Sequence, residues 1–162
     1  MPFHSDPKHC DRYVPSSDLP LRFADIKLVL GALVSLPIGT ALKKDLLDEV
    51  LWQVTFATGN TQNKFMGRYR SAKMVRVAGL KIERDHVYRR KTLLRELIGP
   101  SPDLDRIIAR SQCCVVLTAD EHRLVSDIDG GKKYTLAGVT VYDMCDQTEV
   151  DSEALWPQFD SE

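Results

Sequence analysis

The sequence predicts an α+β fold, a mostly helical single domain with a small β-sheet. Two segments, 22–36 and 41–57, repeat apolar residues at the three- and four-residue spacing of amphipathic helices. The apolar run from Cys113 to Leu117 has the length and composition of a buried strand, and 138–142 (GVTVY) is a second candidate strand. With 162 residues, 43% of them hydrophobic and 28% charged, the chain has the size and composition of one globular domain.

Prolines and charges divide the chain into three regions. Residues 1–21 contain four prolines, which predicts an extended N-terminal arm. Residues 22–145 carry the periodic segments and are expected to form the globular domain. From Asp146 to Glu162 there are six acidic residues and no basic one, which predicts a loose acidic tail over 146–162. This tail, with Trp156 as a candidate anchor, is where we expect a protein partner.

The middle of the chain predicts shorter elements. Residues 69–79 are expected to form a basic helix that Gly79 ends, 80–86 an extended stretch, and 87–97 another helix. Ser101 and Pro102 suit the start of a short helix that reaches about Arg110. Thr118 and Glu121 form a capping box, which predicts that a helix begins directly after the 113–117 strand.

Composition also excludes several classes of protein. No apolar run reaches the roughly 18 residues of a membrane-spanning helix, and the first residues do not resemble a secretory signal. The four cysteines have no regular spacing, so neither a disulfide framework nor a cysteine zinc site is indicated. We therefore expect a cytoplasmic protein with no membrane contact.

Basic residues are concentrated in one segment of a chain whose net charge is −1. Between Lys64 and Arg95 there are eleven basic and two acidic residues, which leaves a formal charge of +9. Such an asymmetry is typical of a surface that binds a polyanion, here nucleic acid and most simply DNA. The alternative is that these side chains cover a solvated helix face or extend past half-buried tyrosines. The candidate nucleic-acid contacts are Arg68, Arg70, Lys73, Arg84, Arg89, Arg90 and Lys91.

Three side chains form a candidate catalytic group. Asp85 and His86 end the extended segment, and His122 follows 36 residues later, in the first full turn of the capped helix. If the two strands pair, these side chains converge at one end of a strand–loop–strand–helix unit. A carboxylate and an imidazole can bind one divalent ion, and a second imidazole can take a proton from water near neutral pH.

This arrangement over 80–127 resembles the HNH (ββα-metal) nucleases. The resemblance implies that Asp85 and His122 hold a divalent metal ion, Mg²⁺ or Mn²⁺ rather than Zn²⁺, and that His86 is the general base. The asparagine that orients the base in that family has no clear match, and Gln112 is the nearest residue to its place. The cysteine pairs that often brace that fold are absent, and the loop between the strands is longer than is common.

Three hypotheses follow. The first is an HNH-like, metal-dependent DNA endonuclease that hydrolyses phosphodiester bonds. The second is a non-catalytic nucleic-acid-binding protein on a degenerate scaffold of the same kind. The third is a protein–protein module, either an inhibitor or an accessory subunit, whose basic face meets an acidic partner.

Overall fold

A computed structural model describes residues 11–58, 67–125 and 127–155 of the chain. The first ten residues of the predicted arm, Lys64, Trp156 and the tail from 156 to 162 lie outside the described residues. Within the described ranges, no helix is both long enough and apolar enough to cross a membrane.

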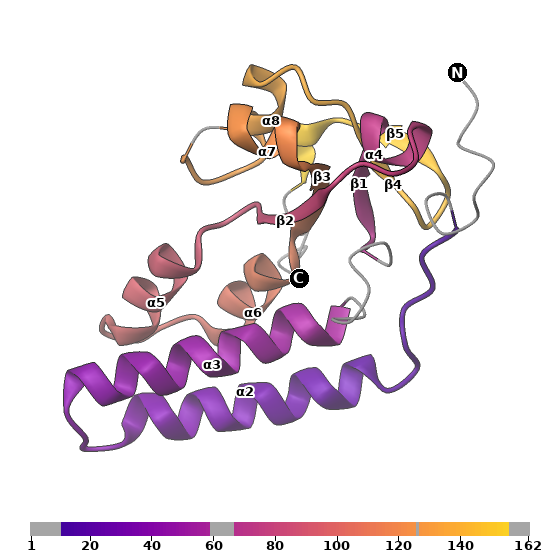
Figure 1. Ribbon diagram of the computed structural model, residues 1–162. Coiled ribbons are helices and arrows are strands. Elements are labelled where there is room, and N and C mark those ends of the chain that lie inside the picture. Colours follow the sequence, from indigo (N-terminus) through magenta and orange to yellow (C-terminus); the bar gives the residue numbers. More distant parts are fainter. Residues whose placement is uncertain (1–10, 59–66, 126, 156–162) are drawn as a thin grey trace.

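Four helices form one side of the molecule (Figure 1). Helices α2 (Leu19–Ser35) and α3 (Thr40–Thr58) lie side by side as an antiparallel pair, and α5 (Arg90–Ile98) and α6 (Leu104–Gln112) pack on α3. The two long helices agree with the predicted periodicity. Helix α2 begins at Leu19, inside the predicted arm of 1–21, because Pro20 fits the first turn of a helix.

A five-stranded sheet forms the other part of the described structure, so the predicted α+β class is confirmed. Its strands are β1 (Tyr69–Ser71), β2 (Ile82–His86), β3 (Cys114–Thr118), β4 (Val141–Asp143) and β5 (Thr148–Val150). The order across the sheet is β2-β3-β1-β4-β5, and only the β1–β3 pairing among them is parallel. Strand β2 therefore lies at an edge of the sheet.

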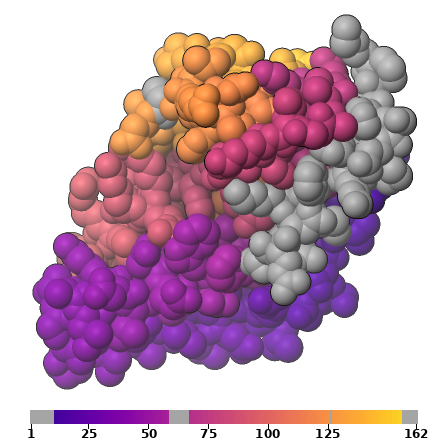
Figure 2. Space-filling view, viewed as in Figure 1, coloured from indigo at the N-terminus to yellow at the C-terminus, as the bar shows by residue number. Residues whose placement is uncertain are grey.

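The predicted strand–strand–helix unit is present. Strand β2 pairs antiparallel with β3, with Asp85 opposite Val115 and His86 opposite Cys114. Helix α7 (Ala119–Leu124) then begins at Thr118, where both hydrogen bonds of the capping box with Glu121 are formed. Figure 2 shows α7 (orange) beside the segment that contains α4 and β2 (magenta), away from the indigo α2 helix.

Three local predictions were wrong. Residues 69–71 form a strand, and only α4 (Ala72–Arg76) of the expected basic helix is helical, because β1 fills the place between β3 and β4. Helix α6 is capped by the Asp103 carboxylate rather than by Ser101. The tail is not loose up to residue 155, because β5 pairs with β4, a 3₁₀ turn η2 (Ser152–Ala154) follows, and Leu155 is buried.

A short helix that the sequence analysis did not predict, α8 (Lys132–Leu136), packs against η2. Its N-cap, Gly131, lies so close to the Ser152 backbone that a Cβ atom there would overlap the Ser152 carbonyl. Glycine at 131 therefore lets α8 approach the end of the chain. Helix α8 in turn carries Lys133 and Tyr134, both buried.

We predict that Gly131→Ala lowers the free energy of unfolding by about 1–3 kcal/mol, because the backbone must move to relieve the overlap. Urea denaturation measures this change. Gly39→Ala is the matched control, since a Cβ at Gly39 meets no atom within 4 Å, and it should change stability by no more than about 0.5 kcal/mol. Equal effects of the two substitutions would show that the close approach is not structurally important.

Candidate functional site

Asp85 and His122 meet on one side of the β2–β3 pair. The Asp85 Oδ1 atom lies 3.6 Å from Nε2 of His122, although the two residues are far apart in the sequence. Strand pairing explains this contact, because Asp85 faces the same side as Val115 and α7 follows β3 directly. The Asp85 side chain is 16% exposed and that of His122 is 43% exposed, so solvent reaches the pair mainly from the helix side.

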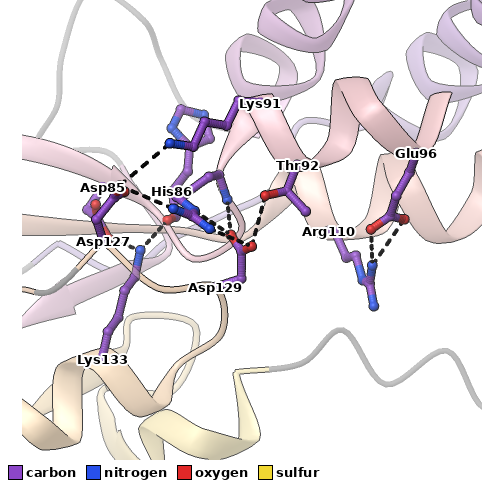
Figure 3. A network of polar contacts seen from close by, with 10 residues as sticks. Asp85, His86, Lys91, Thr92, Glu96, Arg110, Asp127, Asp129 and Lys133 are labelled. Carbon is purple, nitrogen blue, oxygen red and sulfur yellow. Dashed lines mark hydrogen bonds and ion pairs between the residues drawn. The ribbon is translucent and has the colours of Figure 1, made fainter. Parts of the chain in front are cut away.

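The other oxygen of Asp85 is held by α8. Lys133 Nζ lies 2.7 Å from Oδ2, and the Tyr134 hydroxyl donates a hydrogen bond of 2.6 Å to the same atom. Lys133 Nζ also donates to the His86 carbonyl at 2.5 Å, and its side chain is only 2% exposed (Figure 3). Burial, followed by the Asp85 carboxylate, raises the pKa of Tyr134 well above its ordinary value, so the hydroxyl keeps the proton that it donates.

His86 faces the opposite side of β2 from Asp85, since consecutive residues of a strand alternate in direction. Its Nε2 lies 3.0 Å from the Thr55 hydroxyl of α3, and its ring meets the edge of Trp52 at a centroid distance of 5.5 Å. Burial, with a further contribution from Arg90, lowers the pKa of His86 to about 4. The predicted role of His86 as a general base beside Asp85 is therefore not favoured in this conformation.

Gln112 does not join Asp85 either. It borders a cavity together with Arg84 and Cys114, whose side chains share the face of His86, and it does not border the hollow around Asp85. The structure thus brings together two of the four predicted catalytic or metal-binding residues. Gln112 lies elsewhere, and His86 borders the same hollow as Asp85 but directs its ring to Thr55 and Trp52.

An open hollow lies over the free edge of β2, next to Asp85 and His122. Arg84, Arg89, Arg90 and Lys91 border it, together with Asp85, His86, His122 and Asp127. Four basic side chains at one opening suit contact with phosphate groups. Because β2 is an edge strand, the hollow is reached by side chains from both of its faces.

Acidic residues from outside the basic segment neutralise much of its charge. Arg89 contacts Asp127 at 3.1 Å and Asp129 at 3.2 Å, and Lys91 lies 3.6 Å from Asp127. The Arg90 guanidinium contacts Asp48 at 3.3 Å and stacks on Trp52 at 3.9 Å. The formal +9 of the sequence therefore overstates the positive field at the surface. Lys91, 64% exposed, is the most accessible base of the group.

The remaining predicted contacts differ in their access to a ligand. Arg70 is fully buried, and its Nε donates to the Gly67 carbonyl, so its prediction as a nucleic-acid contact is wrong for this conformation. Arg68 is half-exposed but forms a 2.7 Å ion pair with Asp143. Lys73 on α4 is half-exposed, with Asp120 at 4.0 Å. Of these three residues, Lys73 is the most available to an external phosphate.

Asp129 shapes the hollow but was not identified from the sequence as a site residue. Its carboxylate accepts hydrogen bonds from the Arg89 backbone at 2.7 Å and from the Thr92 hydroxyl at 2.9 Å, and so fixes the start of α5 (Figure 3). Partial burial acts to raise the pKa of Asp129, but the hydrogen bonds from Arg89 and Thr92 outweigh it and lower the pKa. The Asp129-Gly130-Gly131 turn was recognised from the sequence, but its partner 40 residues away was not.

The donor atoms around Asp85 fit a weakly held divalent ion. Asp85 Oδ1 and His122 Nε2 are an oxygen and an imidazole nitrogen, and their separation of 3.6 Å is short enough for both to contact one ion at metal–ligand distances of about 2.1 Å. In the described part of the chain, no group of three or more potential metal ligands occurs. Mg²⁺ accepts one or two protein ligands and completes its shell with water and substrate phosphate. Lys133, as a neighbouring positive charge, weakens such a site.

Comparison with known proteins gave no match to a family model, and no significant match to a curated protein or a solved structure. The function must therefore be argued from the geometry of the site.

We predict that stability falls as the pH is lowered from about 6.5 to 4, because the unfolded chain protonates residue 86 before the folded protein does. The shift from 6.5 to about 4 corresponds to about 3 kcal/mol of unfolding free energy. His86→Gln should remove that part of the pH dependence, measured by urea denaturation at pH 7 and pH 4. An NMR titration of the His86 ring with a midpoint near 6.5 would contradict the prediction.

Proposed function

We propose that this protein is a metal-dependent endonuclease that hydrolyses phosphodiester bonds in DNA, with Asp85 and His122 as its metal ligands. The observation that carries this proposal is the 3.6 Å approach of Asp85 Oδ1 to His122 Nε2 on a strand–strand–helix unit. It is supported by the hollow next to that pair, which four basic side chains border. A bound divalent ion would supply charge stabilisation at the phosphate that is cut.

The chain's own residues position the substrate and the ligands. Lys133 and Tyr134 fix one oxygen of Asp85, which leaves the other directed toward His122. Lys91 and Arg89 border the hollow from the start of α5 and are the best placed residues to bind the DNA backbone. Their ion pairs with Asp127 must be exchanged for phosphate when DNA binds.

His86 takes a supporting role in this proposal instead of the role of base. Its contacts with Thr55 and Trp52 attach the end of β2 to α3, and its carbonyl accepts a hydrogen bond from Lys133. A neutral, buried imidazole suits this role, since a charged one would need a counter-ion.

A second candidate function is DNA binding without cutting. It is favoured by the 2.7 Å contact of Lys133 with Asp85, because the ammonium group already neutralises the carboxylate that would hold the metal ion. In this case Asp85 is a structural residue that attaches α8 to the sheet, and the hollow binds the DNA backbone only.

We predict that the protein nicks supercoiled plasmid DNA in Mg²⁺ or Mn²⁺ and that EDTA abolishes nicking. Asp85→Asn and His122→Ala should each lower the rate at least about 100-fold, since metal-ion stabilisation of the phosphate contributes several kcal/mol. Asp120→Asn is the matched control, because Asp120 lies on the same helix as His122 and its side chain is 67% exposed. It should keep the wild-type rate.

Two results would contradict parts of this proposal. Full activity of His122→Ala would show that Asp85 and His122 are not the metal site. No nicking in a panel of divalent metals, with DNA binding intact, would leave the second candidate function.

We predict that DNA binding weakens as salt increases, and that Lys91→Glu lowers affinity severalfold and reduces the salt dependence. Fluorescence anisotropy with a labelled duplex at several salt concentrations measures both. The control is Lys44→Glu, an exposed residue of α3 outside the hollow. Equal losses for the two variants would mean that net charge, and not the hollow, controls binding.

A further inference from the structure

A cavity of about 190 Å³ lies on the face of the sheet opposite Asp85. Among the described residues, it is bordered by the last turns of α3 and α6, by β1, β2 and β3, and by the chain before α2. Arg84 and Cys114 lie on its wall, and both share a face of the β2–β3 pair with His86. The cavity therefore does not include Asp85 or His122, although Arg84 borders both the cavity and the hollow beside that pair.

Arg84 is the unusual residue of this cavity. Among the described residues, its side chain has no hydrogen-bond or ion-pair partner, and its Nη2 atom is buried without one. No aspartate or glutamate lines the cavity among the described residues. Arg68, the second arginine on the wall, differs because Asp143 binds it at 2.7 Å.

The other titratable groups on the wall do not supply a negative charge. Burial raises the pKa of both Cys113 and Cys114 to about 12, and burial also raises the pKa of Tyr69 to about 12. These thiols and this phenol are therefore neutral at physiological pH. With Arg68 neutralised by Asp143, the Arg84 guanidinium gives the described part of the cavity wall a net positive charge.

The Arg84 guanidinium is partly buried, and its Nη2 atom is fully buried. A buried polar atom without a partner is unfavourable in a folded protein and needs an explanation. We propose that the cavity binds a small organic oxyanion, a phosphate or carboxylate group on a short apolar body, with Arg84 as the residue that binds the anion. A guanidinium recognises both groups through paired N–H donors.

The size and the wall of the cavity limit the ligand further. Its volume is below the roughly 300–1,000 Å³ of sites for drug-sized molecules. Leu19, Ala109 and Val116 give it apolar surface, and Gln112 contributes an amide that can hydrogen-bond to the ligand. A substituted benzene ring with one anionic group is a reasonable probe. This inference does not depend on nuclease activity, because neither Asp85 nor His122 borders the cavity.

Thermal unfolding of the full chain with phenyl phosphate, benzoate, inorganic phosphate or neutral phenol tests the proposal. We expect phenyl phosphate or benzoate to raise Tm more than inorganic phosphate does, and phenol to have no effect, since a ligand that binds only the folded state stabilises it. Stabilisation by inorganic phosphate alone would contradict the proposal that the ligand carries an apolar body. No stabilisation by any of the three anions at 10 mM would refute the site.

Arg84→Met separates ligand binding from folding. Without ligand this variant should melt no lower than wild type, because it removes an unpaired buried charge. Its affinity for the anion, measured by calorimetry, should fall at least about tenfold. Arg95→Met, at an exposed arginine of α5, is the matched control and should bind as wild type does. An Arg84→Met protein that is folded and binds the anion normally would overturn the proposal.

Discussion

The ion pair between Lys133 and Asp85 attaches α8 to the edge strand β2 and fixes the carboxylate that meets His122. It joins an edge strand to a short helix across 48 residues of the chain, and Lys133 extends the connection to the His86 carbonyl. Both groups are largely buried, so loss of either would leave an uncompensated charge, which typically costs about 3–5 kcal/mol. These contacts with β2 fix the position of α8, and therefore also the close approach of Gly131 to Ser152.

The alternation of side chains along β2 places its residues in two different environments. Asp85 faces α7 and α8, where it meets His122. On the other face, His86 contacts Thr55 of α3 and Arg84 borders the cavity. The adjacent residues Asp85 and His86 thus lie in different environments. Solvent reaches Asp85 through His122, whereas burial lowers the pKa of His86 to about 4 and keeps its imidazole neutral at physiological pH. The two proposals, for a nuclease site and for an anion cavity, correspond to these two faces.

Most of the described basic side chains between Lys64 and Arg95 fall into two groups, those in ion pairs and those exposed to solvent. Arg68, Arg89 and Arg90 form ion pairs with aspartates at 143, 129 and 48, each distant in the sequence, and so hold β4, the 127–131 turn and α3 in place. Lys73 and Lys91 remain half-exposed or exposed and are available to an external polyanion. Arg84 is the exception, buried in part and without a described partner.

Several elements could be predicted because residues close together in the chain specify them. The periodicity of α2 and α3, the apolar run of β3 and the capping box at Thr118 depend on residues close in the chain, and all three are present. Long-range packing makes 69–71 a strand, adds 148–155 to the fold, and brings Lys133, Tyr134 and Asp129 to the candidate site. It also decided that Asp85 meets His122 while His86 and Gln112 do not. Each of these outcomes depends on which partners the chain brings from a distance, and neither propensity nor spacing along the sequence encodes them.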